Sequence, residues 1–464
     1  RRSQEDKMEE TVQSIFDYID NHFDDHVAEV QRYLQQPSVS AQNLGMQECA
    51  EMTAEYLRAL GADARLVPLE GGHPVVYGTL RSNSSDKTLL IYNMYDVQPP
   101  EPMEGWSSPP WEAAIVDGKI IARGAFNSKG PLMAFVNAVQ SIKAVTGDVP
   151  VNMILLVDGE EELGSLHLPQ FIDAYQDELK QAEAMYGHMP SEMIKGRPQV
   201  ILGFKGNAYF ELEVKLREFD VHSMTAPVVR NPVWRLIWAL NSMRGPDDRI
   251  VIDGFYENVR PPSQDDIDLL PGLVDLYGPE ALAATYRVGD AYRVKLSGSD
   301  FVRELMFTPT LNIDGFLAGY TEPGSKTIVP ASAMAKLDAR LVPDMTVDEV
   351  LGKIRRHLDK SGFEDVEVRF LTGYGAAKTD VNSPVAQAAI RSIEKMGVKP
   401  TVAPLMPGSA PEAMFAEPPL SLPFAMSGLG HGWLMHSPNE YFEVEGVRAC
   451  EKSAVAFLYE YAAT

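Results

Sequence analysis

Acidic and imidazole side chains follow several apolar stretches of this sequence. Such stretches are typical of buried strands, and in parallel sheets reactive groups gather beyond the carboxyl ends of the strands. Carboxylates and imidazoles placed together there can ligate a metal ion or act as general acids and bases. The candidates are Asp96 in YDVQPP, Glu160, Glu161 and Glu162 in DGEEELGS, His188 in YGHMPSE, and His436 in GLGHGWLMHSPNE.

Three consecutive carboxylates, at 160–162, come almost directly after the apolar stretch VNMILLVD (151–158). Removing carboxylates from water is costly unless they hold a cation or carry a proton. The same residues would also suit the solvated amino terminus of a helix, where acidic groups interact favourably with the helix dipole. Spacing alone leaves both interpretations open.

The elements expected to position these groups alternate between helix and strand. Apolar spacing predicts helices over about 9–35, 47–60 and 131–145, and IVDGKII (115–121) reads as a hairpin because Asp117-Gly118 supplies a positive-φ turn. Strands are predicted over 64–68, 75–80, 88–92 and 151–158. Continuously apolar strands between helices indicate a mostly parallel sheet covered by helices on both faces.

The middle of the chain has a different pattern. AYFELEVKL (208–216) alternates like a half-exposed antiparallel strand, and NPVWRLIWALNSMRG (231–245) reads as a helix capped by Asn231. The alternating α/β pattern then resumes near residue 376. The sequence therefore predicts one discontinuous α/β domain, residues 1–205 and 376–464, which carries an inserted α+β domain, residues 206–375.

Composition excludes some partners. The net charge of −24 repels nucleic acid and anionic membrane surfaces, and no stretch reaches the apolar length of a membrane span. Cys49 and Cys450 are expected to be unpaired thiols. The amino terminus lacks the apolar region of a signal peptide, so a cytoplasmic location is expected. His22 and His26 lie on an acidic amphipathic stretch and are expected to be solvated.

The chain resembles the metallopeptidases that include carnosinase, acetylornithine deacetylase, succinyl-diaminopimelate desuccinylase and aminoacylase. The resemblance covers most of the 464 residues, and the matching stretches keep the family's order. It implies an amidohydrolase or peptidase-like enzyme, a catalytic domain with two adjacent zinc ions, and an inserted lid domain through which two subunits pair. The stretches are YNMYDVQPP, DGKIIARGAFNSKG, DGEEELGS, GRPQVILGFKG, DVHS, PGSKTIVPASAMAKLDARLVP and HSPNE.

The resemblance also implies a role for individual positions, and several metal positions are altered here. Met94 stands where the family has a zinc-binding histidine, and Asn127 stands where it has the aspartate that bridges both metals. The general base and the adjacent metal carboxylate fall on Glu161 and Glu162. The next acidic ligand falls on His188 or on the neighbouring Met189, and the last histidine ligand falls on His436.

These replacements change what metal chemistry is expected. A thioether is a poor zinc ligand, and the Asn127 amide has no charge to offset two divalent ions. We therefore expect at most one divalent ion, zinc or manganese, on Glu162, His188 and His436, with Glu161 as general acid/base. The alternative is a metal-independent protein that uses the pocket for ligand binding or for non-hydrolytic acid/base chemistry.

The positions expected to contact substrate are better preserved. His222 in DVHS matches the lid histidine that stabilises the oxyanion, or else it caps a turn at the end of a strand. Arg340 in DARLVP matches the arginine that binds a substrate carboxylate, or else it is a surface arginine; Gly408, Ser409 and Asn127 complete the substrate-binding set. The substrate implied is a small amide or peptide with a free carboxylate, and the assembly implied is a homodimer.

Overall fold

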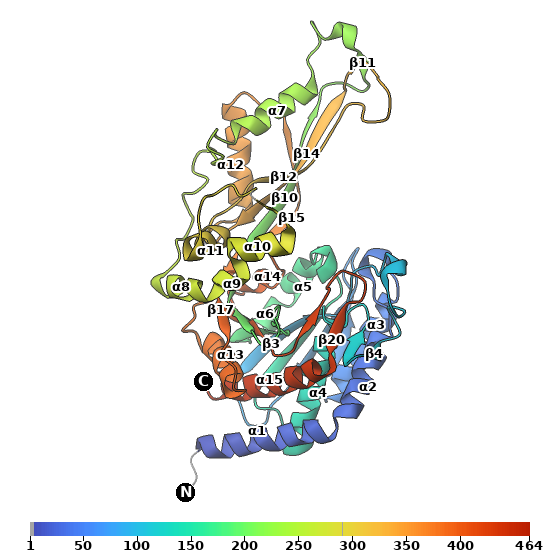
Figure 1. Cartoon of the computed structure of the whole chain (residues 1–464), viewed down its shortest axis with the longest axis vertical. Helices are drawn as coiled ribbons and strands as arrows, with labels where there is room; N and C mark the ends of the chain where they lie inside the picture. Colours follow the sequence, from blue (N-terminus) through green and yellow to red (C-terminus); the bar gives the residue numbers. More distant parts are fainter. Residues whose placement is uncertain (1–3, 290) are drawn as a thin grey trace. The chain divides into compact units, whose positions relative to one another are not determined.

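The computed structural model describes residues 4–289 and 291–464 (Figure 1). The chain divides into two compact units. Unit 1 comprises the residues up to Gly203, Lys378–Pro404 and Phe415–Thr464, and unit 2 comprises Phe204–Ala377 and Leu405–Met414. These limits lie within two residues of the boundaries predicted near 205 and 376, except that 405–414 cluster with unit 2. Among the described residues, no helix has the length and apolar character to cross a membrane.

Unit 1 is an α/β structure built on an eight-stranded sheet with the order β1-β2-β6-β3-β7-β18-β8-β17. Its central strands β6, β3, β7 and β18 run parallel to one another, whereas β1 and β2 are antiparallel. The strands are β1 (Asp63–Val67), β2 (Val75–Leu80), β3 (Thr88–Met94), β6 (Asn152–Asp158), β7 (Ala184–His188), β8 (Gln199–Ile201), β17 (Thr401–Ala403) and β18 (Phe424–Ser427). A mostly parallel central sheet is confirmed.

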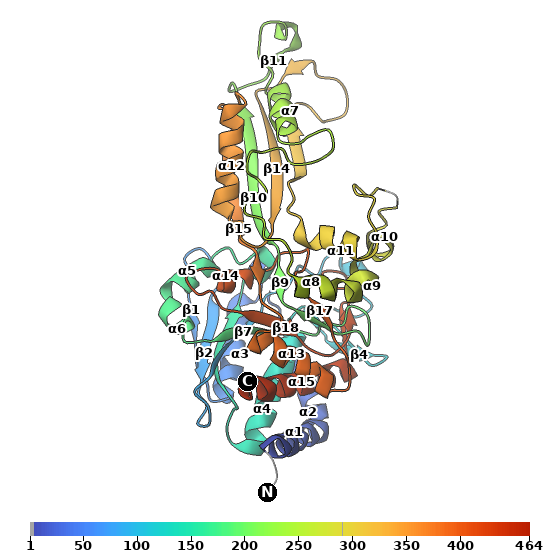
Figure 2. The same ribbon diagram turned by 90° about the vertical axis from the view of Figure 1, so that its left-hand side faces the viewer.

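Helices and loops cover both faces of this sheet, which is why its strands are apolar throughout (Figures 1 and 2). Leu89 and Ile91 of β3 join the main core, whereas Tyr92 packs on Phe415 on the other face. The helices of unit 1 are α1 (Gln4–Asn21), α2 (Phe23–Leu34), α3 (Met46–Ala59), α4 (Lys129–Thr146), α5 (Leu168–Ala174), α6 (Gln176–Leu179), α13 (Pro384–Lys395) and α15 (Val444–Ala462), with α14 (Ala413–Ala416) at its edge.

A smaller sheet in unit 1 contains the predicted hairpin. Its order is β19-β20-β5-β4, with β4 (Ala114–Val116), β5 (Lys119–Ile121), β19 (Gly432–Trp433) and β20 (Tyr441–Glu443). Asp117 and Gly118 both have positive φ, as a two-residue hairpin turn requires. The pairing of β5 with β20 places the segment after β5 next to the segment before β20.

The predicted helix over 9–35 is wrong in one respect, because it consists of α1 and α2, separated at His22. The prediction that His26 is solvated is also wrong. His26 is 5% exposed, and its Nδ1 lies 2.8 Å from Glu451 Oε2 of α15. That partner is 425 residues away in the sequence, so local amphipathicity did not reveal it. Cys49 and Cys450 are buried and unpaired, as predicted.

Unit 2 is an α+β structure around a four-stranded antiparallel sheet with the order β12-β14-β10-β15. Asn231 Oδ1 accepts a hydrogen bond from the Val233 amide, which confirms the predicted cap of α7. The strands are β10 (Gly206–Lys215), β11 (Val221–His222), β12 (Asn312–Ala318), β13 (Ile328–Val329), β14 (Ser332–Leu341) and β15 (Glu367–Tyr374); the helices are α7 (Pro232–Ser242), α8 (Gln264–Leu269), α9 (Val274–Tyr277), α10 (Pro279–Tyr286), α11 (Gly298–Phe307) and α12 (Val347–Lys360).

Candidate functional site

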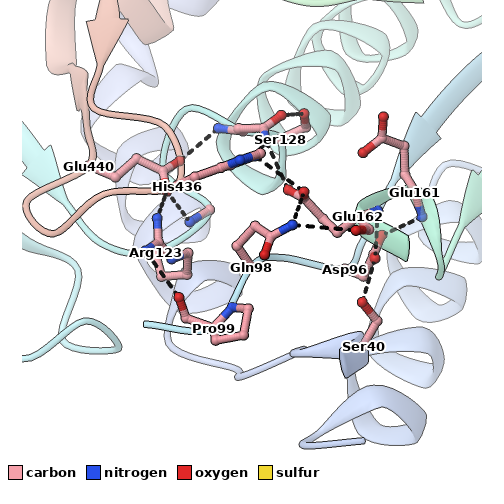
Figure 3. A network of polar contacts seen from close by, with 12 residues as sticks. Ser40, Asp96, Gln98, Pro99, Arg123, Ser128, Glu161, Glu162, His436 and Glu440 are labelled. Carbon is pink, nitrogen blue, oxygen red and sulfur yellow. Dashed lines mark hydrogen bonds and ion pairs between the residues drawn. The ribbon is translucent and has the colours of Figure 1, made fainter. Parts of the chain in front are cut away.

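Two of the three carboxylates after β6 lie on a short 3-10 turn, η3 (Glu161–Leu163), which the Asp96 side chain holds in place (Figure 3), and Glu160 directly precedes this turn. Asp96 Oδ1 accepts the Glu161 amide and Oδ2 accepts the Glu162 amide, each at 3.1 Å. The Ser40 hydroxyl donates a further bond to Oδ2 over 2.8 Å. A buried carboxylate that accepts three bonds anchors the turn to the end of β3.

Asp96 is fully buried, and its neighbours act on its pKa in opposite directions. Burial, followed by repulsion from Asp158, raises the pKa of Asp96 well above its usual value, whereas the donors from Ser40 and Glu162 lower it. Figure 3 shows the Glu161 carboxylate pointing away from Asp96. Asp96 therefore binds Glu161 through its backbone amide and not through its carboxylate.

Glu162 is bound by two side-chain amides. Asn127 Nδ2 donates to Glu162 Oε1 over 2.8 Å, and Gln98 Nε2 donates to Glu162 Oε2 over 2.9 Å. The Glu162 side chain is only 4% exposed. Both carboxylate oxygens therefore accept amide hydrogen bonds, which offset the cost of burying the carboxylate.

His436 completes this cluster. Its Nε2 lies 3.2 Å from Glu162 Oε2 and 3.0 Å from Asn127 Nδ2. The hydrogen bond to Glu162 raises the pKa of His436, because the adjacent carboxylate favours the charged imidazolium. The His436 side chain is about half exposed, at 54%, so this is the face of the cluster that a ligand can reach.

A buried ion pair fixes the segment that carries Asn127. Glu440 Oε1 accepts the Asn127 amide at 2.8 Å and the Phe126 amide at 3.0 Å. Its Oε2 lies 2.8 Å from Arg123 Nη1, and both side chains are 1% exposed. The loop before β20 and the loop after β5 are thereby joined, which brings Asn127 and His436 to the same place.

His188 does not join this cluster, so the prediction that it ligates a metal with Glu162 and His436 is not supported by its position. It is fully buried, and its Nε2 lies 3.1 Å from the Cys450 carbonyl oxygen of α15. Its ring also packs on Phe135 of α4. Burial lowers the pKa of His188 to about 4, so its imidazole is neutral at ordinary pH.

The neighbouring Met189 directly follows the last residue of β7 and contacts the segment that carries Asn127. The Ser128 hydroxyl donates to Asn127 Oδ1 over 2.9 Å, and its Oγ lies 3.6 Å from Met189 Sδ. Met189 is therefore the residue of this pair that faces Asn127.

These donors do not fit the pair of zinc ions that the resemblance implies. Met94 and Met189 offer thioethers, and Asn127 donates to Glu162 instead of adding a second carboxylate. Within residues 4–289 and 291–464, no group of three or more histidine, cysteine, aspartate or glutamate side chains could hold a metal ion. Glu162 and His436 are the two expected ligands that the structure brings together.

His222, in unit 2, stands at the end of β11 and caps a turn. Its Nδ1 accepts the Met224 amide over 3.1 Å, which is the structural alternative weighed from the sequence. Because Nδ1 is an acceptor, the neutral ring carries its proton on Nε2. The side chain is exposed, so capping the turn does not prevent Nε2 from donating to a ligand.

Arg340 and Ser409, also in unit 2, are in direct contact. Arg340 Nη1 donates to Ser409 Oγ over 2.7 Å, and Arg340 Nε lies 3.2 Å from Asp338 Oδ2. Ser409 Oγ in turn donates to the Gly206 carbonyl over 3.0 Å. A guanidinium next to a hydroxyl can bind a carboxylate by paired hydrogen bonds. Gly408 precedes this serine, and its carbonyl accepts the Lys205 amide.

Sequence reasoning placed Glu440 among the groups at the strand ends but missed Gln98 and Arg123 as parts of the cluster. Gln98 and Arg123 lie inside the quoted stretches YNMYDVQPP and DGKIIARGAFNSKG, so their place in those motifs was the available signal. The roles of these residues depend on contacts between distant chain segments, such as the contact between Arg123 and Glu440. The motifs alone do not specify such contacts.

Comparisons with known proteins agree with the resemblance. Residues 90–460 match the model of peptidase family M20/M25/M40. A human β-Ala-His dipeptidase is 31% identical over 373 residues, which cover 75% of this chain and 71% of the human protein. The Cys-Gly metallodipeptidase dug1 of Schizosaccharomyces pombe is 27% identical over 377 residues, with 76% of each chain covered.

Solved structures show the same relationship. An M20 family metallo-carboxypeptidase, Sso-CP2 from Sulfolobus solfataricus, superposes with a TM-score of 0.84 at 35% identity and covers 95% of this chain and 99% of its own. The dipeptidase Dug1p from Saccharomyces cerevisiae gives a TM-score of 0.78 at 25% identity, with 98% and 99% covered.

Proposed function

Because the chain belongs to peptidase family M20/M25/M40, we propose that it hydrolyses the amide bond of a dipeptide or similar small substrate that has a free carboxylate. The observation that carries this proposal is η3, where Asp96 binds the amides of Glu161 and Glu162 and the Glu161 carboxylate points away from them (Figure 3). The β-Ala-His and Cys-Gly dipeptidases among the relatives support the substrate class.

Glu161 is the proposed general acid/base. Its carboxylate would accept a proton from water as the water oxygen attacks the amide carbon. It would then return that proton to the departing nitrogen as the carbon–nitrogen bond breaks. Proton transfer of this kind typically contributes about 10²–10⁴-fold to a rate.

The substrate-binding tasks fall to residues of unit 2 and to Asn127. Arg340 and Ser409, with Gly408 beside them, would bind the free carboxylate, because they present a guanidinium and a hydroxyl 2.7 Å apart. His222 would donate from Nε2 to the oxyanion, since its Nδ1 accepts the Met224 amide. Asn127 is proposed to contact the substrate next to His436.

At most one divalent metal ion, zinc or manganese, is proposed for the Glu162 and His436 pair. A pair of ions does not fit these residues, and the steps above are assigned to the protein's own groups.

A second candidate function is ligand binding or non-hydrolytic acid/base chemistry without a metal. It is favoured by the amide bonds to Glu162, because Asn127 and Gln98 occupy both of its carboxylate oxygens. A homodimer formed through unit 2 is also proposed. Apolar side chains of this unit are well exposed, among them Trp234 at 56% and Leu317 at 63%.

The test is turnover of a dipeptide panel, including β-Ala-His and Cys-Gly, by wild-type protein and by Glu161→Gln. We expect the rate of hydrolysis to fall by at least about 100-fold in the variant, while substrate binding is retained. Glu183→Gln, an exposed glutamate outside the site, is the matched control. Wild-type protein that binds the dipeptides but cleaves none of them even when supplied with zinc or manganese would favour the second candidate, and unchanged turnover in Glu161→Gln would remove Glu161 from the mechanism.

A further inference from the structure

Unit 2 contains a cavity of about 230 Å³ whose lining is mainly apolar. Its charged residues include Arg293 and Glu304, whose side chains lie 3.2 Å apart and so neutralise each other. Phe301 and Tyr292 pack edge to face, with ring centroids 5.4 Å apart. The apolar lining is formed by Leu282, Tyr292, Val294, Phe301 and Leu305.

This cavity adjoins the residues proposed to bind the substrate carboxylate. Thr310, in its wall, donates its amide to the Arg340 carbonyl over 3.0 Å, and its hydroxyl accepts the Arg340 amide over 3.1 Å. Lys205, in the same wall, donates its amide to the Gly408 carbonyl over 3.0 Å. Two lining residues are thus hydrogen-bonded to the backbone of Arg340 and Gly408, all within unit 2.

Lys205 is a structural part of the wall and not an open anion site. It is 2% exposed, and its Nζ donates to the Leu305 carbonyl at 2.7 Å and to the Thr308 carbonyl at 2.6 Å. These carbonyls end α11, so Lys205 fixes the helix that supplies Leu305. Burial lowers the pKa of Lys205 to about 7, and the nearby Arg340 charge acts in the same direction. The ammonium is engaged, and an apolar occupant is favoured.

We propose that this cavity receives the apolar side chain of the substrate residue that carries the free carboxylate. The assignment rests on the proposed function, because it places that carboxylate on Arg340 and Ser409. An apolar cavity of about 150 Å³ can hold a benzene molecule. A cavity of about 230 Å³ therefore has room for a leucine or phenylalanine side chain, and a glycine would leave it unfilled.

The test measures binding of free glycine, leucine and phenylalanine to the full-length protein by titration calorimetry. Leucine and phenylalanine should bind at least about tenfold more tightly than glycine. Leu282→Trp fills the cavity and should abolish this difference while glycine binding persists. Leu305→Trp fills the cavity from α11 and should give the same result. If one of the two variants misfolds, the other still tests the proposal. Leu296→Trp, at an exposed leucine outside the cavity, should keep the difference.

Equal affinity for the three amino acids, or discrimination that survives both filling variants, would overturn the proposal. Free amino acids are not hydrolysed, so the result does not depend on peptidase activity. Retained discrimination without dipeptide cleavage would reject the proposed function but keep the cavity assignment. Cleavage of Ala-Gly and Ala-Phe with equal kcat/KM would reject the cavity assignment but keep the function.

Discussion

Asn127 donates its side-chain amide to Glu162 Oε1 over 2.8 Å. In the related metallopeptidases, the resemblance places a metal-bridging aspartate at the Asn127 position. A donor has replaced an acceptor there, and the carboxylate that would ligate a metal is instead bound by amides. The contact therefore predicts how zinc affinity will respond when position 127 carries an aspartate.

Asn127→Asp should strengthen zinc binding by at least about tenfold, because it places a second carboxylate beside Glu162 and removes the amide that occupies Oε1. Calorimetric titration of zinc into apo protein measures the change. Asn258→Asp, at an exposed asparagine that bonds Glu349, is the control for added charge alone. Two tightly bound zinc ions per wild-type chain would contradict this account.

Asp96→Asn should loosen η3, because an amide nitrogen cannot accept the hydrogen bond that one carboxylate oxygen now accepts. Loss of a hydrogen bond to a charged group costs about 2 kcal/mol. Faster hydrogen exchange at residues 160–163 is expected, with exchange in α12 unchanged. Ser40→Ala, which removes only the third donor to Asp96, should have a smaller effect. Unaltered exchange at η3 would show that other contacts hold the turn.

Arg340→Ala should raise KM for dipeptides by about tenfold or more and affect kcat less, because it removes a charge-assisted contact to a non-reacting carboxylate. Steady-state kinetics on a dipeptide and on its carboxamide separate the effects. The variant should lose its preference for the free acid. Arg369→Ala, an exposed arginine bonded to Glu211, is the control. A wild type that cleaves acid and amide equally would argue against this role.

His188→Gln should flatten the loss of stability in acid and leave zinc binding unchanged. Burial holds the folded pKa of His188 near 4, below the unfolded value near 6.5. Between these values the unfolded chain binds the extra proton, so the stability of wild type falls as the pH falls from 6.5 to 4. In the wild type, His188 contributes at most about 3 kcal/mol to this loss of stability. Urea unfolding from pH 4 to 7 measures it.

If the stability difference between wild type and His188→Gln were constant over that range, His188 would not be titrating as a buried group. A zinc affinity reduced by the same substitution would instead support His188 as a ligand. His436→Gln provides the comparison, because His436 lies 3.2 Å from Glu162 and is the imidazole expected to affect metal binding.

Local chemistry in the sequence determined the fold class and many elements. Strands such as 151–158 could be predicted from the sequence because both of their faces are buried and therefore apolar. The 115–121 hairpin could be predicted because Asp117-Gly118 suits its turn. Asn231 marked the start of α7 for a similar reason. The motifs and their order then identified the family, and with it the positions where Met94 and Asn127 depart from the pattern.

Only the tertiary structure decided which of the candidate groups meet. His188, the last residue of β7, lies in the core against Cys450, whereas the next residue, Met189, lies beside Ser128. The contacts of Glu162 with Asn127 and His436 join segments far apart in the chain. Sequence periodicity describes which face is buried, but it does not specify which distant side chain will lie against that face.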